Sequence, residues 1–95
     1  MVTHMHVAFR VEDYERWKAG YDASVEHRKA AGEISYQVFR DVEDPNIVTV
    51  VSVQQSAEGV QALLDSPEIK EGMKKAGIVE TGTMLIVEEV DSGVL

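Results

Sequence analysis

The positions of apolar and polar residues, taken with a period of two, predict four β-strands along the chain. The strands are expected at Thr3–Val11, residues 34–42, Ile47–Gln54 and residues 83–90. The last two carry apolar residues on both faces, which is typical of strands that are covered on both sides. We therefore expect Ile47–Gln54 in the interior of a sheet, joined to the preceding strand by a hairpin turn at residues 43–46.

An apolar repeat of three to four residues predicts a first helix within residues 11–32. Asp13 is placed to cap its first turn, and Gly32 is placed to end it. This region holds the only tryptophan and two of the three tyrosines of the chain. A single stripe of the helix, expected to pack on the sheet, carries Tyr14, Trp17, Tyr21, Ser24, Val25 and Arg28.

A second helical region follows the third strand. It is expected to begin at Ser56, to restart at Ser66 and Pro67, and to end at Gly77. Serine before each start predicts a side-chain cap for both segments. Residues 78–82 are predicted to be a connector, and residues 91–95 a loose tail.

The order strand, helix, strand, strand, helix, strand predicts one α+β domain over residues 1–95. Right-handed crossovers place the first and third strands in the centre of a four-stranded antiparallel sheet, which is a ferredoxin-like βαββαβ fold. Two helical regions cover one face of such a sheet, and the chain has no further element for the other. A second copy packed sheet to sheet would cover the apolar second face, so we expect a homodimer with a barrel-like interior.

The composition of the chain disfavours several classes of function. The formal net charge of −8 disfavours binding to a nucleic acid backbone. The absence of cysteine excludes disulfides, thiolate nucleophiles and cysteine metal sites. No apolar run approaches the length of a membrane helix, which is about 20 residues, and the first residues do not form a secretory signal. We expect a cytoplasmic protein without a membrane partner.

The first strand offers candidate acid–base residues. Its apolar residues, such as Met5 and Phe9, are expected to face the helices, which leaves His4, His6 and Arg10 toward the dimer interior; the reverse assignment stays open. The two histidines share a face because they are two residues apart on a strand. They are interpreted as a general base, with a metal site or an ordinary polar pair as the alternatives. No metal site is predicted, because the pair has no clear third ligand.

Other candidate residues would bind a substrate or stabilise an anion. Tyr36 and Arg40 are predicted to share the interior face with Arg10, where they would stabilise an anionic intermediate or form intersubunit ion pairs. Trp17 and Tyr21 are interpreted as core residues first and as the wall of an apolar pocket second. Further along their stripe, Tyr14, Ser24 and Arg28 are the expected polar contacts of that pocket.

Six short runs are spread along the chain: VEDYERWK (11–18), RKAAG (28–32), QVFRD (37–41), DPN (44–46), SPEIK (66–70) and AGI (76–78). Together they resemble the small dimeric α/β-barrel proteins of the antibiotic biosynthesis monooxygenase superfamily, including small bacterial members described as cyclases. The resemblance implies a homodimer with a pocket between the sheet and the helices of each subunit. It also implies oxidation of aromatic or quinol substrates by oxygen without a cofactor, or cyclisation of polyketides, although many members have no assigned activity.

We interpret the chain as a small homodimeric barrel protein that binds an apolar or aromatic molecule. In the enzymatic form it is a cofactor-independent monooxygenase or cyclase. His6 or His4 would accept a proton from a phenol, and Arg40 or Arg10 would stabilise the resulting anion. The alternative is a non-catalytic ligand-binding or structural dimer, because no complete catalytic motif is present.

Overall fold

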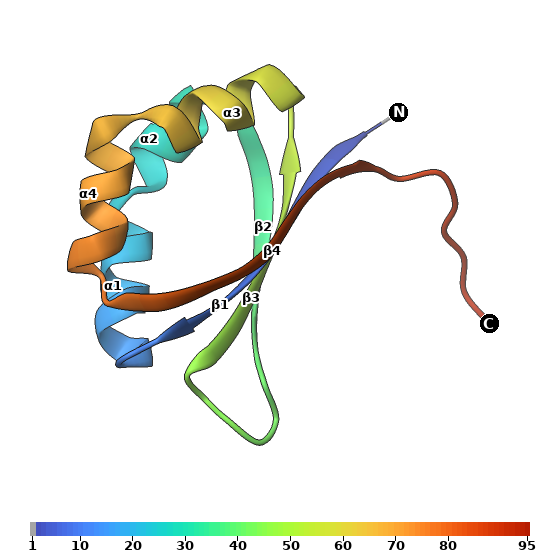
Figure 1. Ribbon diagram of the computed structural model, residues 1–95. Coiled ribbons are helices and arrows are strands. Elements are labelled where there is room, and N and C mark those ends of the chain that lie inside the picture. Colours follow the sequence, from blue (N-terminus) through green and yellow to red (C-terminus); the bar gives the residue numbers. More distant parts are fainter. Residues whose placement is uncertain (1) are drawn as a thin grey trace.

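The computed structural model describes residues 2–95, which form one antiparallel sheet with helices on one face (Figure 1). The strand order is β2-β3-β1-β4, so the first and third strands are central, as predicted for the ferredoxin-like fold. The elements are β1 (Thr3–Val11), α1 (Tyr14–Ala23), α2 (Val25–Ala30), β2 (Glu33–Arg40), β3 (Ile47–Gln54), α3 (Ala57–Asp65), α4 (Pro67–Lys75) and β4 (Ile78–Glu88).

The core lies between the helices and the side of the sheet that we call the helix face. On β1, Met5 and Phe9 are buried there, and on β3 Val48 and Val50 are buried beside them. The predicted assignment of the two faces of β1 is therefore confirmed. Strand alternation puts His4, His6 and Arg10 on the opposite side, which we call the open face.

The helix predicted within residues 11–32 is two segments, because Ser24 leaves the helical path between α1 and α2. The Ser24 hydroxyl donates to the carbonyl of Tyr21 at 2.7 Å, and the Ser24 N–H is directed to the same carbonyl. Such local bonds of a serine compete with the regular helical ladder. The predicted inward stripe continues across the break, with Trp17 3% and Arg28 5% exposed.

Side-chain caps agree with the sequence at two of the three predicted helix starts. Asp13 accepts from the N–H of Glu15 at 3.0 Å, and Ser56 Oγ accepts from the N–H of Gly59 at 3.1 Å. Ser66 makes no side-chain cap bond, so its predicted role is wrong, although Pro67 does begin α4 as expected. The side chain of Ser24 caps no N–H of α2 either; it is engaged with Tyr21 instead.

Strand β4 begins at Ile78, which corrects the predicted connector at residues 78–82. The pairing of β1 with β4 shifts register twice, and each irregularity breaks the alternation that would have marked the strand in the sequence. One irregularity lies beside Gly82, where a Cβ would stand 2.8 Å from the Ala8 carbonyl oxygen. Only glycine fits this close approach of two backbones.

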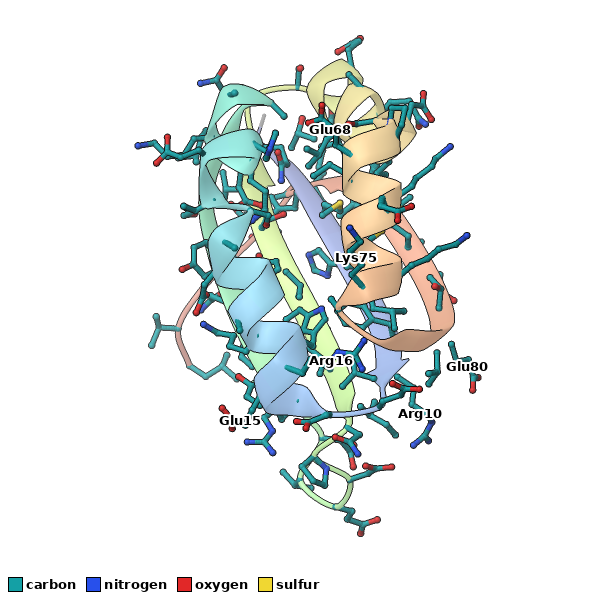
Figure 2. The ribbon with its side chains drawn as sticks, turned by 90° about the vertical axis from the view of Figure 1, so that its left-hand side faces the viewer. Arg10, Glu15, Arg16, Glu68, Lys75 and Glu80 are labelled. Carbon is teal, nitrogen blue, oxygen red and sulfur yellow. The ribbon has the colours of Figure 1, made fainter. Side chains whose placement is uncertain are left out.

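The helices form two pairs, α1 with α2 and α3 with α4, which lie side by side on the helix face, as Figure 2 shows. Arg16 of α1 reaches the end of α4, where its Nε and Nη2 donate to the carbonyl of Lys75 at 3.1 and 2.7 Å. This contact joins the first helical pair to the second. None of the helices among residues 2–95 is long and apolar enough to cross a membrane.

The open face carries apolar side chains beside His4, His6 and Arg10, and no helix of residues 2–95 covers it (Figure 1). Leu85 of β4 is 50% exposed there, opposite His6, and Phe39 of β2 is 49% exposed, opposite Thr49. Val51 and Val53 of β3 are half-buried between these edge strands. Several exposed large apolar side chains on one sheet face are typical of a surface that a protein partner covers.

Candidate functional site

A row of aromatic rings runs under α1 toward β2. The rings of Trp17 and Tyr21 are stacked with centroids 4.9 Å apart, and Tyr36 of β2 meets Tyr21 edge-on at 5.5 Å. Tyr14 and Phe9 contact Trp17 from the other side, at 5.9 and 5.3 Å. Trp17 is buried within this row and is a core residue, whereas Tyr36 is 44% exposed and ends the row at the surface.

A buried ion pair lies at the Tyr21 end of the row. The side chains of Arg28 and Glu33 are each only 6% exposed, and Arg28 Nη1 donates to Glu33 Oε2. Arg28 Nε also donates to Ser24 Oγ at 3.0 Å, and Nη2 to the carbonyl of Tyr21 at 3.0 Å. Its Cζ lies 3.8 Å from the ring centroid of Tyr21 and 4.8 Å from that of Tyr36. The guanidinium is therefore fixed by hydrogen bonds and by two aromatic faces.

Two residues of β3 extend this pair into a network. Gln54 Nε2 donates to Ser52 Oγ at 2.8 Å and to Glu33 Oε1 at 3.4 Å. Ser52 and Gln54 are 1% and 3% exposed and lie on the helix face of β3. We call the five connected residues the polar cluster: Ser24, Arg28, Glu33, Ser52 and Gln54.

Sequence reasoning selected Ser24 and Arg28 of the polar cluster but missed the other three. A signal was present in β3, where the helix-facing positions read Val48, Val50, Ser52, Gln54 and so change from apolar to polar. Glu33 gave no comparable signal, because it follows the helix-ending Gly32 and reads as a surface residue of a turn. Its burial depends on the register of β2 with β3.

Within the part of the chain that the structure describes, residues 2–95, two buried polar side-chain atoms have no hydrogen-bond partner: the Tyr21 hydroxyl and Gln54 Oε1. Burial, together with the negative charge of Glu33, raises the pKa of Tyr21 well above its ordinary value. The Tyr21 hydroxyl is therefore protonated across the physiological range and is able to donate. Buried polar atoms in proteins are nearly always paired, so these two are candidates to contact a ligand.

A hollow of about 410 Å³ lies at the surface between α2 and β2. Glu33 and Tyr36 form part of its wall, so the hollow reaches both the polar cluster and the end of the aromatic row. Its volume lies in the range of small-molecule sites, about 300–1,000 Å³. The complete lining is Val25, Lys29, Glu33, Ile34, Ser35 and Tyr36.

The open face carries the predicted acid–base residues. The rings of His4 and His6 have centroids 6.1 Å apart. Arg10 Nη1 donates to Asp44 Oδ2 at 2.8 Å, in a pair that is partly exposed. The N–H of Asn46, and then Arg10, hold the pKa of Asp44 below its usual range. Among residues 2–95 there is no group of three or more His, Cys, Asp or Glu side chains that could hold a metal ion.

The sequence of the chain matches one family over most of its length. Residues 4–75 match the family model described as antibiotic biosynthesis monooxygenase. The chain belongs to the antibiotic biosynthesis monooxygenase family. Among curated protein sequences, none matches it.

Solved structures share the fold of this antibiotic biosynthesis monooxygenase family member. SnoaB, a cofactor-independent oxygenase from Streptomyces nogalater, is 8% identical with a TM-score of 0.78, covering 96% of this chain and 95% of its own. A candidate antibiotic biosynthesis monooxygenase from Bordetella bronchiseptica is 16% identical with a TM-score of 0.78, covering 94% and 97%. Another from Chloroflexus aurantiacus is 21% identical with a TM-score of 0.67, covering 99% and 98%. At these identities the likeness shows the fold.

The placement of Tyr36 and Arg40 in this family member corrects a prediction. Both were expected on the open face with Arg10, but Tyr36 pairs with Ser52 and Arg40 pairs with Val48, so both lie on the helix face. Arg40 Cζ stacks over the ring of Tyr14 at 4.0 Å. On the helix side Arg40 contacts Tyr14, and Tyr36 contacts Tyr21. The pattern of polar and apolar residues along the strand does not predict these contacts with the aromatic row.

The same geometry separates two groups of residues that were expected to act together. His4 and His6 lie on the open face, whereas Trp17 and Tyr21 lie on the helix face, with the sheet between them. A histidine and the aromatic row therefore cannot contact one substrate within a subunit of this antibiotic biosynthesis monooxygenase family member. The structure brings together Tyr14, Trp17, Tyr21, Ser24, Arg28, Tyr36 and Arg40, and it leaves His4, His6 and Arg10 apart from them.

Proposed function

We propose that this protein is a homodimer whose subunits each bind a small aromatic molecule on the helix side and oxidise it with molecular oxygen, without a cofactor. The observation that carries the proposal is the row of rings that ends at Tyr36, on the wall of the hollow between α2 and β2. Flat apolar walls with a few fixed polar groups are the usual form of a site for an aromatic ligand.

Family membership supports the reaction class. SnoaB, with which the chain shares its fold, is named a cofactor-independent oxygenase. In such a reaction, one oxygen atom converts a ring CH₂ to C=O and the other leaves as water with the two hydrogens. The substrate supplies all of the electrons, so the balance requires no further reductant.

Arg40 is the proposed anion-stabilising residue of the helix side. The substrate must lose a proton before it reacts with oxygen, and the resulting enolate needs a positive charge nearby. Arg28 is neutralised by Glu33, whereas Arg40 is exposed, stacks over Tyr14, and makes its hydrogen bond with the carbonyl of Pro45. Arg40 lies at the Tyr14 end of the row, so its positive charge is available to a ligand that extends along the row from the hollow.

The dimer part of the proposal rests on the open face. A second copy of the chain presents the same apolar side chains, so the two sheets would cover each other with twofold symmetry. His4 and His6 would then lie within the contact between the sheets, where they act as packing and polar-contact residues rather than as a base for the helix-side ligand.

One observation favours a second function, a non-catalytic ligand-binding dimer. The helix-side site has no histidine, since His4 and His6 lie on the open face and His27 is an exposed neighbour of Glu68 on α4. A binding protein needs the aromatic row and the polar cluster but no base. The two functions differ in turnover, which the following measurement detects.

Oxygen consumption with anthrone tests the proposed reaction. The wild-type protein is expected to consume one O₂ per anthrone converted to anthraquinone, and Arg40→Met is expected to lower kcat about tenfold or more. Lys70→Met, which removes an exposed cation on α4, is the matched control and should leave the rate unchanged.

Three outcomes of this assay contradict the proposal in different ways. No turnover above the spontaneous rate, with anthrone bound, leaves the binding function and removes the oxygenase. A loss of rate in His6→Ala, with Arg40→Met unaffected, places the chemistry on the open face. An equal loss in Arg40→Met and Lys70→Met removes the specific role of Arg40.

A further inference from the structure

We propose that Lys29 makes the hollow between α2 and β2 selective for an aromatic ligand that carries a carboxylate group. The inference rests on the proposed helix-side binding of an aromatic molecule, and it adds the substituent of this molecule and the residue that recognises it. Lys29 is exposed on α2 and forms part of the wall of the hollow. Its flexible four-carbon stem lets the ammonium group follow an anion on a bound ligand.

The wall of the hollow carries one positive charge that no carboxylate of the chain neutralises. Two of the lining residues are charged, Lys29 and Glu33. Glu33 is neutralised by Arg28 in the buried ion pair, in which each side chain is 6% exposed. Lys29 makes no ion pair within residues 2–95. The net charge that the wall presents to a ligand is therefore positive.

This local charge stands out against the charge of the whole molecule. The formal net charge of the chain is −8, so the long-range field repels an anion rather than attracting it. Salt screens exposed charges beyond about 10 Å at 0.1 M, which leaves contacts within the hollow to decide the preference. A preference of the hollow for an anion would thus come from Lys29 itself.

The other lining residues suit the ring of an aromatic acid. Val25 of α2 and Ile34 of β2 are apolar, and the ring of Tyr36 is 44% exposed. A single ammonium balances the single charge of a carboxylate. A phosphate ester, with a charge of about −1.5 to −2, would leave excess negative charge beside Glu33, and an amine would be repelled by Lys29.

A second cation lies at the other end of the aromatic row. Arg40 stacks over Tyr14 and, like Lys29, makes no ion pair in the part of the chain that the structure describes. Tyr36, beside Lys29 on the wall of the hollow, is four residues from Arg40 on β2, which is about 13 Å along a strand. A ligand that meets both cations is therefore elongated, with its carboxylate at Lys29 and its reacting ring toward Arg40.

A matched pair of ligands tests the selectivity by isothermal titration calorimetry at neutral pH. The probes are 2-naphthoate and 2-naphthamide, which share a ring system and differ in charge. At low ionic strength the wild-type protein is expected to bind 2-naphthoate about five- to tenfold more tightly, the size of one charged hydrogen bond at a partly exposed site. The difference should shrink in about 0.5 M NaCl, because salt screens the pair.

Variants assign the preference to Lys29. Lys29→Met removes the charge and keeps most of the stem, so it is expected to bind the two probes equally, with the affinity for 2-naphthamide changed less than twofold. Lys29→Arg keeps the charge and should keep the preference. Lys70→Met, which removes an exposed cation on α4, is the matched control and should discriminate as the wild-type protein does.

The outcomes separate failure of this inference from failure of the proposed function. Equal wild-type affinities for the two probes, or a preference that persists in Lys29→Met, overturn the role of Lys29 and leave aromatic binding intact. An equal loss of preference in Lys70→Met also overturns it, because the effect would then come from the overall charge. Binding of neither probe by the wild-type protein overturns both proposals.

Discussion

Replacement of Arg28 by methionine is expected to lower the free energy of unfolding by about 3–5 kcal/mol. The reason is that Glu33, with a side chain only 6% exposed, would keep its negative charge in the interior without its guanidinium partner. Domains of this size are stable by about 5–15 kcal/mol, so the variant would lose a large part of its stability. Urea unfolding followed by circular dichroism measures the change.

Two controls attribute this loss to the buried charge. Arg10→Met breaks a partly exposed ion pair with Asp44, and the expected change is about 1 kcal/mol or less. The double variant Arg28→Met/Glu33→Leu removes both charges, so it should recover much of the stability lost by Arg28→Met alone. A double variant no more stable than the single one would show that packing of Arg28 against Tyr21 and Tyr36 dominates instead.

Replacement of Leu85 by lysine is expected to convert the proposed dimer to a monomer. Leu85 is half exposed at the open face, so the monomer accommodates lysine without cavity or strain. In a twofold contact each change occurs twice, and two ammonium groups would enter an apolar interface. Light scattering should give one chain mass, 10.5 kDa, for the variant and twice that mass for the wild-type protein.

The matched control is Met73→Lys on α4. Met73 is 41% exposed, close to the value for Leu85, but it lies on the helical layer rather than on the open face. The control should stay dimeric at the same concentration. Dissociation by Met73→Lys with a dimeric Leu85→Lys would move the contact to the helices, and a monomeric wild-type protein would refute the dimer altogether.

Much of the fold follows from local patterns in the sequence. The alternation in β1 and the apolar residues on both faces of β3 predicted these two strands, and right-handed crossovers placed them in the centre of the sheet. Gly32 and Gly77 do end helices, with positive φ angles of 104° and 84°. The apolar residues on both faces of β3 predicted that one sheet face would need a partner. The bulges of β4 were missed, because a residue inserted into a strand removes the alternation by which a strand is recognised.

The candidate site was only partly predictable, because it depends on register between distant segments. Tyr21 and Arg28 were found from helical spacing, but their contacts with Glu33 and Gln54 require the pairing of β2 with β3. Arg40 was assigned to the dimer interior together with Arg10, but its pairing with Val48 places it on the helix face. Long-range contacts of this kind leave no local signal.

The most direct test of the helix-side site is a crystal structure of the wild-type protein with 2-naphthol. The ring is expected in the hollow between α2 and β2, beside Tyr36, and two copies of the chain are expected in contact through their open faces. A ring bound between the sheets beside His6, with the hollow between α2 and β2 empty, would contradict the proposed site.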